Sequence, residues 1–400
     1  MKATPDQIKQ TLDTALTKPF TMRLPVSLEF GAGCLEKLPS YLTGNQRALV
    51  VTGRSSMKNA GVTDKLARIL SGAGIESALF DELSAEPDDS EIEAAAEMAR
   101  QMKADVIVGC GGGSAMDAAK LVAVAASHPE PLLAYRAGGT HEITQATLPI
   151  VLVTSTSGTG SHVGRVAVVT EPEKKIKRAL ISDFLYPKAA FCDPEILALM
   201  PASLTAASGF DAFAQALEGY LSSSDHPMGK FCAQEAMRII SHTLPRVIRD
   251  GNNLELRAEM AWADTLQGIS LATNTVITAH IIGMVLGGRY DIRHAQAVAV
   301  VTVAALRHSR NGAVEKLANI ARFMGCKDDL SPEALADWAI ESIEQLIKTI
   351  GLGKNLAELG VPSTDYEEIA RDVRANFALR LDSDPVPKQV SDLISILKES

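Results

Sequence analysis

The chain has 400 residues, of which 46% are hydrophobic, and 39 basic against 48 acidic residues give it a formal net charge of −9. This length exceeds one ordinary domain and favours two. The negative charge argues against nucleic acid or an anionic membrane as the main partner. No apolar run reaches the length of a membrane span, and the N-terminal sequence MKATPDQIKQTLD lacks the hydrophobic core of a secretory signal.

Cysteine usage points to a reducing compartment. The cysteines are odd in number, scattered, and without CxxC pairing, which fits free thiols better than a disulfide framework. They are Cys34, Cys110, Cys192, Cys232 and Cys326. With no secretory signal expected, we predict a cytoplasmic protein.

Strand and helix patterns alternate in the first half of the chain. Residues 47–53 (RALVVTG) and 77–83 (SALFDEL) have the apolar, β-branched character of strands. A helix is predicted from Ser90, which has Glu93 at the spacing of a capping box. Further strands are predicted before Gly111 and before Ser155. Such alternation predicts a mostly parallel sheet covered by helices.

The second half of the chain has only helical patterns. The alternation stops after about residue 195, so we place a domain boundary near Asp193–Pro194. The prediction is therefore an α/β domain over 1–194 followed by an all-helical domain over 195–400.

Two loops that follow predicted strands carry glycines and hydroxyls. Gly111, Gly112 and Gly113 lead into a helix, where a close backbone approach and free N–H groups suit a phosphate. Ser114 could add a hydroxyl or cap the helix. The pattern is not the GxGxxG fingerprint. The loop from Ser155, with Thr156 and Thr159, suits phosphate or ribose contacts, and the alternative for both loops is an ordinary turn.

Four polar residues in the helical half could converge on a divalent ion. Asp211 and Gln215 are four residues apart and share one face of a helix. His280 and His294 are fourteen apart, with glycines at 287–288 that predict a break between two helices. An Asp, an amide and two imidazoles would form a mixed O/N site. The alternative is that these are satisfied core residues.

Four motifs, in this order, resemble the iron-containing (group III) alcohol dehydrogenase family. The resemblance runs from about Leu24 to about Leu379. The motifs are GGGSAMDAAK, STSGTGSHVGRVAVVT, CDPEILALMPASLTAASGFDAFAQALEGY and HIIGMVLGGRYDIRH. The resemblance implies a dinucleotide-binding α/β domain, an all-helical metal and substrate domain, and hydride transfer between NAD(P)H and a small alcohol or aldehyde in the cleft between them.

The resemblance also implies Fe²⁺ or Zn²⁺ held by one Asp and three His. Asp211, His280 and His294 fall on three ligand positions, whereas Gln215 stands where the fourth His is expected. A neutral amide oxygen is a weaker and harder ligand than imidazole, so Gln215 could ligate the ion or leave the site without metal. In the second case His280, His294 and His162, which replaces a family Glu, are the candidates to stabilise the developing alkoxide.

Cofactor choice has one clue. Many NAD-preferring members have an Asp where this chain has Gly53, and Arg54 and Ser55 could instead receive a 2′-phosphate, which favours NADP(H) over NAD(H). Lys177 matches a family Lys near the cofactor. Asp117 is expected either on the nicotinamide side or as an organiser of the loop.

The substrate and the assembly are less constrained. Arg289 and Arg293 flank His294 and could recognise an anionic group on the substrate, but they could equally face solvent or pair with Asp291. The resemblance implies a homodimer or larger oligomer. Three other hypotheses stay open: a metal-independent reductase, a dehydroquinate synthase-like enzyme, and a non-catalytic nucleotide-binding descendant.

Overall fold

The computed structural model describes residues 19–44, 46–171 and 176–400. Within these ranges the chain forms two compact units. The sheet unit comprises residues 24–205 and 249–268, and the helical unit comprises residues 206–248 and 269–400 together with residues 19–23. The segment 249–268 therefore packs with the sheet, although it lies in the predicted helical half. The boundary near residue 194 stays a prediction.

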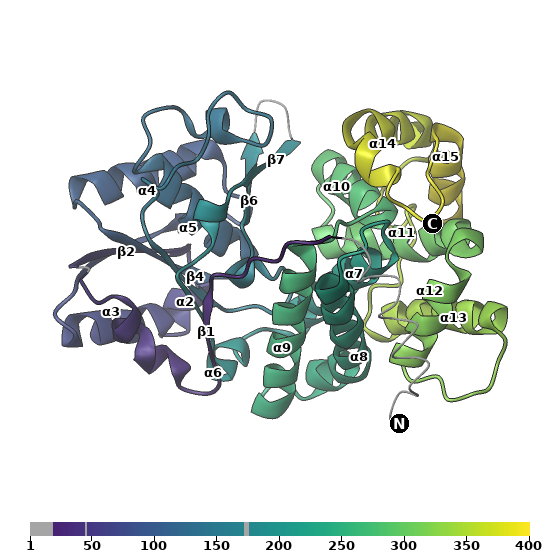
Figure 1. Ribbon diagram of the computed structural model, residues 1–400, viewed down its shortest axis with the longest axis horizontal. Coiled ribbons are helices and arrows are strands. Elements are labelled where there is room, and N and C mark those ends of the chain that lie inside the picture. The colour runs from purple at the N-terminus through teal and green to yellow at the C-terminus, as the bar shows by residue number, and fades with distance from the viewer. Residues whose placement is uncertain (1–18, 45, 172–175) are drawn as a thin grey trace. The chain divides into compact units, whose positions relative to one another are not determined.

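Six parallel strands form the centre of the sheet unit (Figure 1). Their order is β1-β8-β5-β4-β2-β3, and every pairing is parallel. The predicted fold class, a parallel α/β sheet followed by helices, is confirmed. The strands are β1 (Ser27–Phe30), β2 (Arg47–Gly53), β3 (Glu76–Leu83), β4 (Val106–Gly111), β5 (Ile150–Thr154) and β8 (Ala189–Cys192).

Both faces of the sheet are covered because its central strands are apolar on both sides. Leu49 and Ile107 pack on the face covered by α4 (Asp89–Gln101) and α5 (Gly113–Ala125). Their neighbours Val50 and Val108 pack on the opposite face, with α3 (Val62–Gly72). A continuous β-branched run is the expected pattern for a parallel strand buried on both faces. Figure 1 shows the helices on the two sides of the sheet.

The direction of strand succession reverses between β2 and β4. From β2 the chain moves outward to β3, crosses back to β4, and continues through β5 to β8. Ligands of open α/β sheets bind outside the carboxyl ends of the strands at such a reversal. The loops after Gly53 and Gly111 flank this point, and the loop after Thr154 follows on the next strand.

Two local features of the sheet unit differ from expectation. The capping box of α4 is formed by Asp88 and Glu91 rather than by Ser90 and Glu93. Asp88 Oδ1 accepts the backbone N–H of Glu91, while Ser90 donates its hydroxyl to Asp88. A second, antiparallel sheet of β6 (Val166–Glu171) and β7 (Ile176–Ile181) was not predicted.

The helical unit contains the four proposed metal-site residues. α10 runs through Gly287 and Gly288 and ends at Tyr290, so the predicted break at the two glycines is wrong. A break between two helices does occur, but at residues 291–293. Asp291 adopts a left-handed conformation (φ 54°), and α11 begins at His294. The sheet unit also contains α2 (Ser56–Asn59), α6 (Pro194–Leu197) and most of α9 (Leu254–Leu271). The helical unit contains most of α7 (Ala202–Leu221), together with α8 (Pro227–Arg249), α10 (Thr278–Tyr290), α11 (His294–Ser309), α12 (Val314–Phe323), α13 (Pro332–Thr349), α14 (Tyr366–Leu381) and α15 (Val390–Glu399).

Two sequence-level expectations concern the chain as a whole. All five cysteines are free, in agreement with the expected free thiols, and all five are also buried. No helix in the described part of the chain is long and apolar enough to cross a membrane.

A buried lysine connects α5 to the loop after β5. The Nζ atom of Lys120 lies within 3.0 Å of four oxygens: Ser161 O and Oγ, Gly164 O and Val166 O. The side chain is fully buried, and this burial lowers its pKa to about 8, against the opposing effect of Asp117. Without the ammonium group, several buried carbonyls would have no donor.

We expect Lys120→Met to lower the free energy of unfolding by about 2–4 kcal/mol, because it leaves buried carbonyl oxygens unpaired. Chemical denaturation would measure the change. Lys58→Met is the matched control, because Lys58 is exposed and pairs with Asp81 at the surface; this change should cost no more than about 0.5 kcal/mol. Equal losses in the two variants would contradict this role for Lys120.

Candidate functional site

Three potential metal ligands converge in the helical unit. They are Asp211 on α7, His280 in the first turn of α10, and His294 at the start of α11. One ligand atom from each lies within 4.8 Å of the others. Asp211 and His280 are buried, whereas His294 is partly exposed. The turn at residues 291–293 brings the second imidazole back to the first, since the ring centres are 5.6 Å apart.

Gln215 lies one helical turn after Asp211, as its spacing predicts. Its Nε2 donates to Asp211 Oδ2 at 3.1 Å. Its Oε1 is buried and has no hydrogen-bond partner within the described residues. An orphaned buried acceptor is costly and needs an explanation. The amide oxygen of Gln215, two imidazole nitrogens and a carboxylate are suitable ligands for a divalent ion, which would also give this oxygen a partner.

Glu218 completes the cluster and was missed at the sequence level. Its Oε2 accepts from His280 Nδ1 at 2.8 Å and from the backbone N–H of Ile277 at 2.9 Å. Its Oε1 accepts the backbone N–H of His280 at 3.1 Å. One carboxylate from α7 therefore caps α10 and fixes the imidazole of His280, with Nε2 left on the side of Asp211. The signal was available, because Asp211, Gln215 and Glu218 share one face of α7.

The two carboxylates determine the protonation of His280. Burial by itself would lower the pKa of His280, but Glu218 and Asp211 outweigh this effect and raise it to about 10. Without a metal the imidazole would carry a proton on each nitrogen. A metal ion needs the neutral form, so binding would displace the proton from Nε2 while Glu218 keeps the proton on Nδ1.

The two glycine-containing loops of the sheet unit lie against each other. A side chain at Gly112 would meet Thr156 at 3.2 Å, and one at Gly113 would meet Thr159 at 2.6 Å. Gly111 has φ 151°, which L-residues rarely adopt. The structure thus brings the two predicted loops together at the start of α5.

The first turn of α5 is open to an anion. Its N-cap, Gly112, offers no side-chain cap, and Ser114 is exposed beside it. Such a helix start presents free N–H groups and the positive end of the helix dipole. Ser155, by contrast, is buried, and its N–H donates to Gly111 O at 2.9 Å.

Asp117 organises the loop rather than facing solvent. Its carboxylate accepts from Ser161 Oγ at 2.5 Å and from the backbone N–H of Val168 at 3.0 Å. Of the two roles expected for Asp117, these contacts support the organising one. Lys177 is exposed and pairs with Glu86 at 2.7 Å, so its expected cofactor contact stays a prediction.

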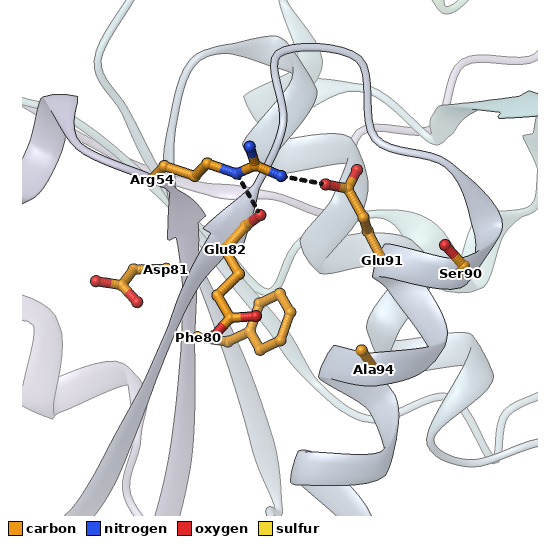
Figure 2. Close-up of a pocket in the computed structure, with 7 residues that line it drawn as sticks. All are labelled: Arg54, Phe80, Asp81, Glu82, Ser90, Glu91 and Ala94. Atoms are coloured by element: carbon orange, nitrogen blue, oxygen red, sulfur yellow. Dashed lines mark hydrogen bonds and ion pairs between the residues drawn. The ribbon is translucent and has the colours of Figure 1, made fainter.

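A cavity of about 400 Å³ lies beyond Gly53, lined by the side chains shown in Figure 2. Arg54 crosses its rim. Its Nε donates to the carbonyl of Glu82 at 3.0 Å, and its guanidinium pairs with Glu91 at 3.3 Å. The residues that line the cavity include three acidic ones, Asp81, Glu82 and Glu91, and one basic one, Arg54. Ser55 occupies the N-cap of α2 without a side-chain cap hydrogen bond. These contacts give no support to the expected 2′-phosphate site.

Two family patterns together match nearly the whole chain. The pattern described as iron-containing alcohol dehydrogenase matches residues 25–194, and the C-terminal pattern of the Fe-containing alcohol dehydrogenase family matches residues 205–400. The chain belongs to the iron-containing alcohol dehydrogenase family. It is an oxidoreductase of this NAD-dependent family, whose members use NAD(H) and a divalent metal.

Relatives and a solved structure agree with this membership. The 1,3-propanediol dehydrogenase of Citrobacter freundii is 36% identical over 332 residues, which cover 82% of this chain and 85% of that protein. The NAD-dependent methanol dehydrogenase of Bacillus methanolicus is 28% identical, over 94% of this chain and 98% of its own. A crystal structure of 1,3-propanediol oxidoreductase superposes with a TM-score of 0.90 and 32% identity, and covers 96% of this chain and 100% of that one.

His162 does not join the metal-ligand cluster of this alcohol dehydrogenase. It belongs to the sheet unit, is fully buried, and shares its Nε2 with Thr265 Oγ1 at 2.9 Å. Burial, with a smaller effect of Lys120, lowers its pKa to about 3. A neutral imidazole with no exposed surface has no open side for a substrate, so these surroundings do not support the catalytic role expected for His162.

The arginines expected to bind an anionic substrate group are at the surface. Arg289 pairs with Glu368 at 2.5 Å and with Asp372 at 3.6 Å. Its partners are therefore these two acids of α14, and not Asp291, which one alternative had expected. Arg293 is exposed, at the N-cap of α11. The structure does not support either residue as an anion site.

Glu218→Gln should weaken metal binding by about 10- to 100-fold, because a neutral amide cannot hold the Nδ1 proton of His280 as a carboxylate does. Titration of the metal-stripped protein with Zn²⁺, followed calorimetrically, would measure the change. Glu341→Gln is the control, since Glu341 is an exposed residue of α13. A Glu218→Gln protein that binds Zn²⁺ as tightly as the parent would contradict the role given to Glu218.

Proposed function

We propose that this protein transfers hydride between NAD(H) and a small alcohol or aldehyde at a divalent ion held by Asp211, Gln215, His280 and His294. The observation that carries the proposal is the cluster itself: three ligand atoms within 4.8 Å and the buried, unpartnered Oε1 of Gln215 beside them. Known relatives that act on 1,3-propanediol and methanol support a small substrate.

Each residue of the cluster has a distinct task in this reaction. Asp211 and the two imidazoles would hold the ion, and Gln215 would add a neutral oxygen. A bound divalent ion supplies Lewis-acid polarisation of the carbonyl, and a bound nicotinamide supplies the hydride. Glu218 keeps the proton of His280 on Nδ1, so that Nε2 stays available as a ligand.

The sheet unit would bind the nucleotide at the reversal of strand order. The open start of α5 suits the pyrophosphate, and Thr156 and Thr159 border it. We propose NAD(H) rather than NADP(H), although the absence of a carboxylate at Gly53 favoured NADP(H). Arg54 is already paired, and the acids of the adjacent cavity would repel a 2′-phosphate.

The role of Gln215 can be tested by substitution. Gln215→His should tighten metal binding about tenfold or more, because imidazole is the better ligand for Fe²⁺ and Zn²⁺. Gln215→Leu should weaken binding, since it removes the oxygen. Metal content after purification without chelator, and Zn²⁺ affinity of the stripped protein, are the measurements.

Aldehyde reduction before and after metal removal completes this test. We expect activity to disappear with the metal and to return on reloading. Unchanged metal affinity in Gln215→Leu would exclude the amide as a ligand. Activity that persists without metal would favour the metal-independent reductase, and no nicotinamide oxidation by the metal-loaded protein with any aldehyde would favour a non-catalytic protein.

Cofactor preference provides a separate test. We expect kcat/KM for NADH to exceed that for NADPH by about tenfold or more, a difference of about 1.4 kcal/mol or more in transition-state binding. Glu91→Gln should improve NADPH use severalfold, because it removes a negative charge and releases Arg54. Glu93→Gln, on the exposed side of α4, is the control. A parent protein that prefers NADPH would contradict the assignment.

A further inference from the structure

The last turn of α14 lies beside the first turn of α10. The two helices pack against each other and run antiparallel. At one end Tyr290 donates its hydroxyl to Asp365 at 2.7 Å, and at the other Thr278 donates its hydroxyl to Asp384 at 2.6 Å. Since α10 begins at Thr278, the end of α14 is next to the turn that contains His280.

The end of α14 is held in place on both sides. The helix is interrupted at Phe377, where φ is −133° and ψ is 28°. Beyond the helix, the carbonyl of Ser383 accepts the backbone N–H of Ser223. Asp384 is buried and accepts from Ser309 Oγ at 2.7 Å and Lys388 Nζ at 2.9 Å. The final turn of α14 is thus a fixed part of the metal-site surroundings.

Arg380 lies in this final turn and has no partner. Its side chain is partly buried, and within the described residues its guanidinium makes no hydrogen bond or ion pair. Burial lowers its pKa, and the nearby carboxylate of Glu218 opposes this effect. Glu218 accepts three N–H groups, from Ile277 and His280, and within the described residues no hydrogen bond joins it to Arg380.

A partly buried guanidinium with five unused donors is costly unless an anion binds it. The planar fork of Arg matches the oxygens of a carboxylate, sulfonate or phosphonate. These groups share one chemistry, an oxyanion on a short carbon chain. Arg289 differs from Arg380 in this respect, because its guanidinium is paired with Glu368.

We propose that Arg380 binds an oxyanion on the substrate, and that this protein acts on short acidic aldehydes and the corresponding hydroxy acids. The proposal rests on the hydride-transfer function above and names its substrate class. In the reductive direction the aldehyde carbon takes the hydride of NADH, the carbonyl oxygen takes a proton, and the oxyanion is unchanged. Arg380 makes no contact with the reacting bond, so it would determine specificity.

The test compares a carboxylate aldehyde with its neutral ester and adds a sulfonate aldehyde. The metal-loaded protein is assayed with NADH and 4-oxobutanoate, its neutral methyl ester, and 2-oxoethanesulfonate. We expect kcat/KM for at least one anion to exceed that for the ester by roughly 10- to 100-fold, the range of a charge-assisted pair. The two anions sample a carboxylate and a sulfonate at two distances from the aldehyde carbon.

Arg380→Gln should raise KM for the preferred anion by a similar factor. For the methyl ester, both kcat and KM should stay within about twofold of the values of the parent protein. Arg380→Lys should retain part of the preference, because it keeps the charge and loses the fork. Arg371→Gln is the control, since Arg371 is an exposed residue of the same helix that pairs with Glu367.

If Arg380 serves only to balance the charge of Glu218, its substitution has a different expected result. In that case Arg380→Gln would reduce metal content or thermal stability and would affect anionic and neutral aldehydes equally, which would overturn the proposal. Equal use of anion and ester by the parent protein would also overturn it, even if no variant folds. If none of the three aldehydes is reduced, the proposal for Arg380 fails, and the proposed function fails with it only if no other small aldehyde is reduced either.

Discussion

One buried carboxylate connects the functional parts of the helical unit. Glu218 projects from α7 and is bound by three N–H groups at the start of α10. It therefore fixes the position of α10 and the ring of His280 at once. Removing a partner from such a buried, charged network costs far more than losing a surface ion pair. The metal-ligand cluster depends on this contact, because Asp211 and Glu218 come from the same helix face.

The sheet unit depends on a different constraint, the close approach of two loops. Gly112 and Gly113 leave room for Thr156 and Thr159, and larger residues would clash there. Lys120 and Asp117 then fix the second loop from α5, through Ser161. The polar groups that hold the loops are buried, whereas the start of α5 is left uncapped for a ligand. The residues that hold the two loops together are thus different from those that are open to a ligand.

The sequence predicted features whose cause is local. The apolar strands over 47–53 and 106–111 and the shared face of Asp211 and Gln215 follow from periodicity, and all appear in the structure. The convergence of the two histidines was a hypothesis that the family resemblance strengthened, and the structure does bring their side chains together, with the break between the helices at 291–293.

The predictions that the structure corrects or does not support concern features that distant residues determine. Glycine propensity placed the α10 break at 287–288, but packing against α14 keeps that helix intact as far as Tyr290. The pairing of Arg54 with Glu91 joins residues 37 positions apart, and Lys120 and Thr265 enclose His162. Side-chain patterns within one segment contain no information about such contacts. The sequence patterns likewise gave no sign of Arg380, which is related to the metal-ligand cluster by the packing of α10 against α14 and by the effect of Glu218 on its pKa.

Charge balance links the altered ligand set to the unpaired arginine. Two carboxylates, Asp211 and Glu218, lie in the cluster, and a divalent ion would offset both of them. The amide of Gln215 and the neutral imidazoles add no charge, so Arg380 leaves an excess of one positive charge close to the cluster. A neutral aldehyde would leave that charge partly buried and unpaired, at a cost that an anionic substrate removes. A buried charge needs a partner: Glu218 has three N–H donors within the protein, whereas Arg380 would find its partner in the substrate.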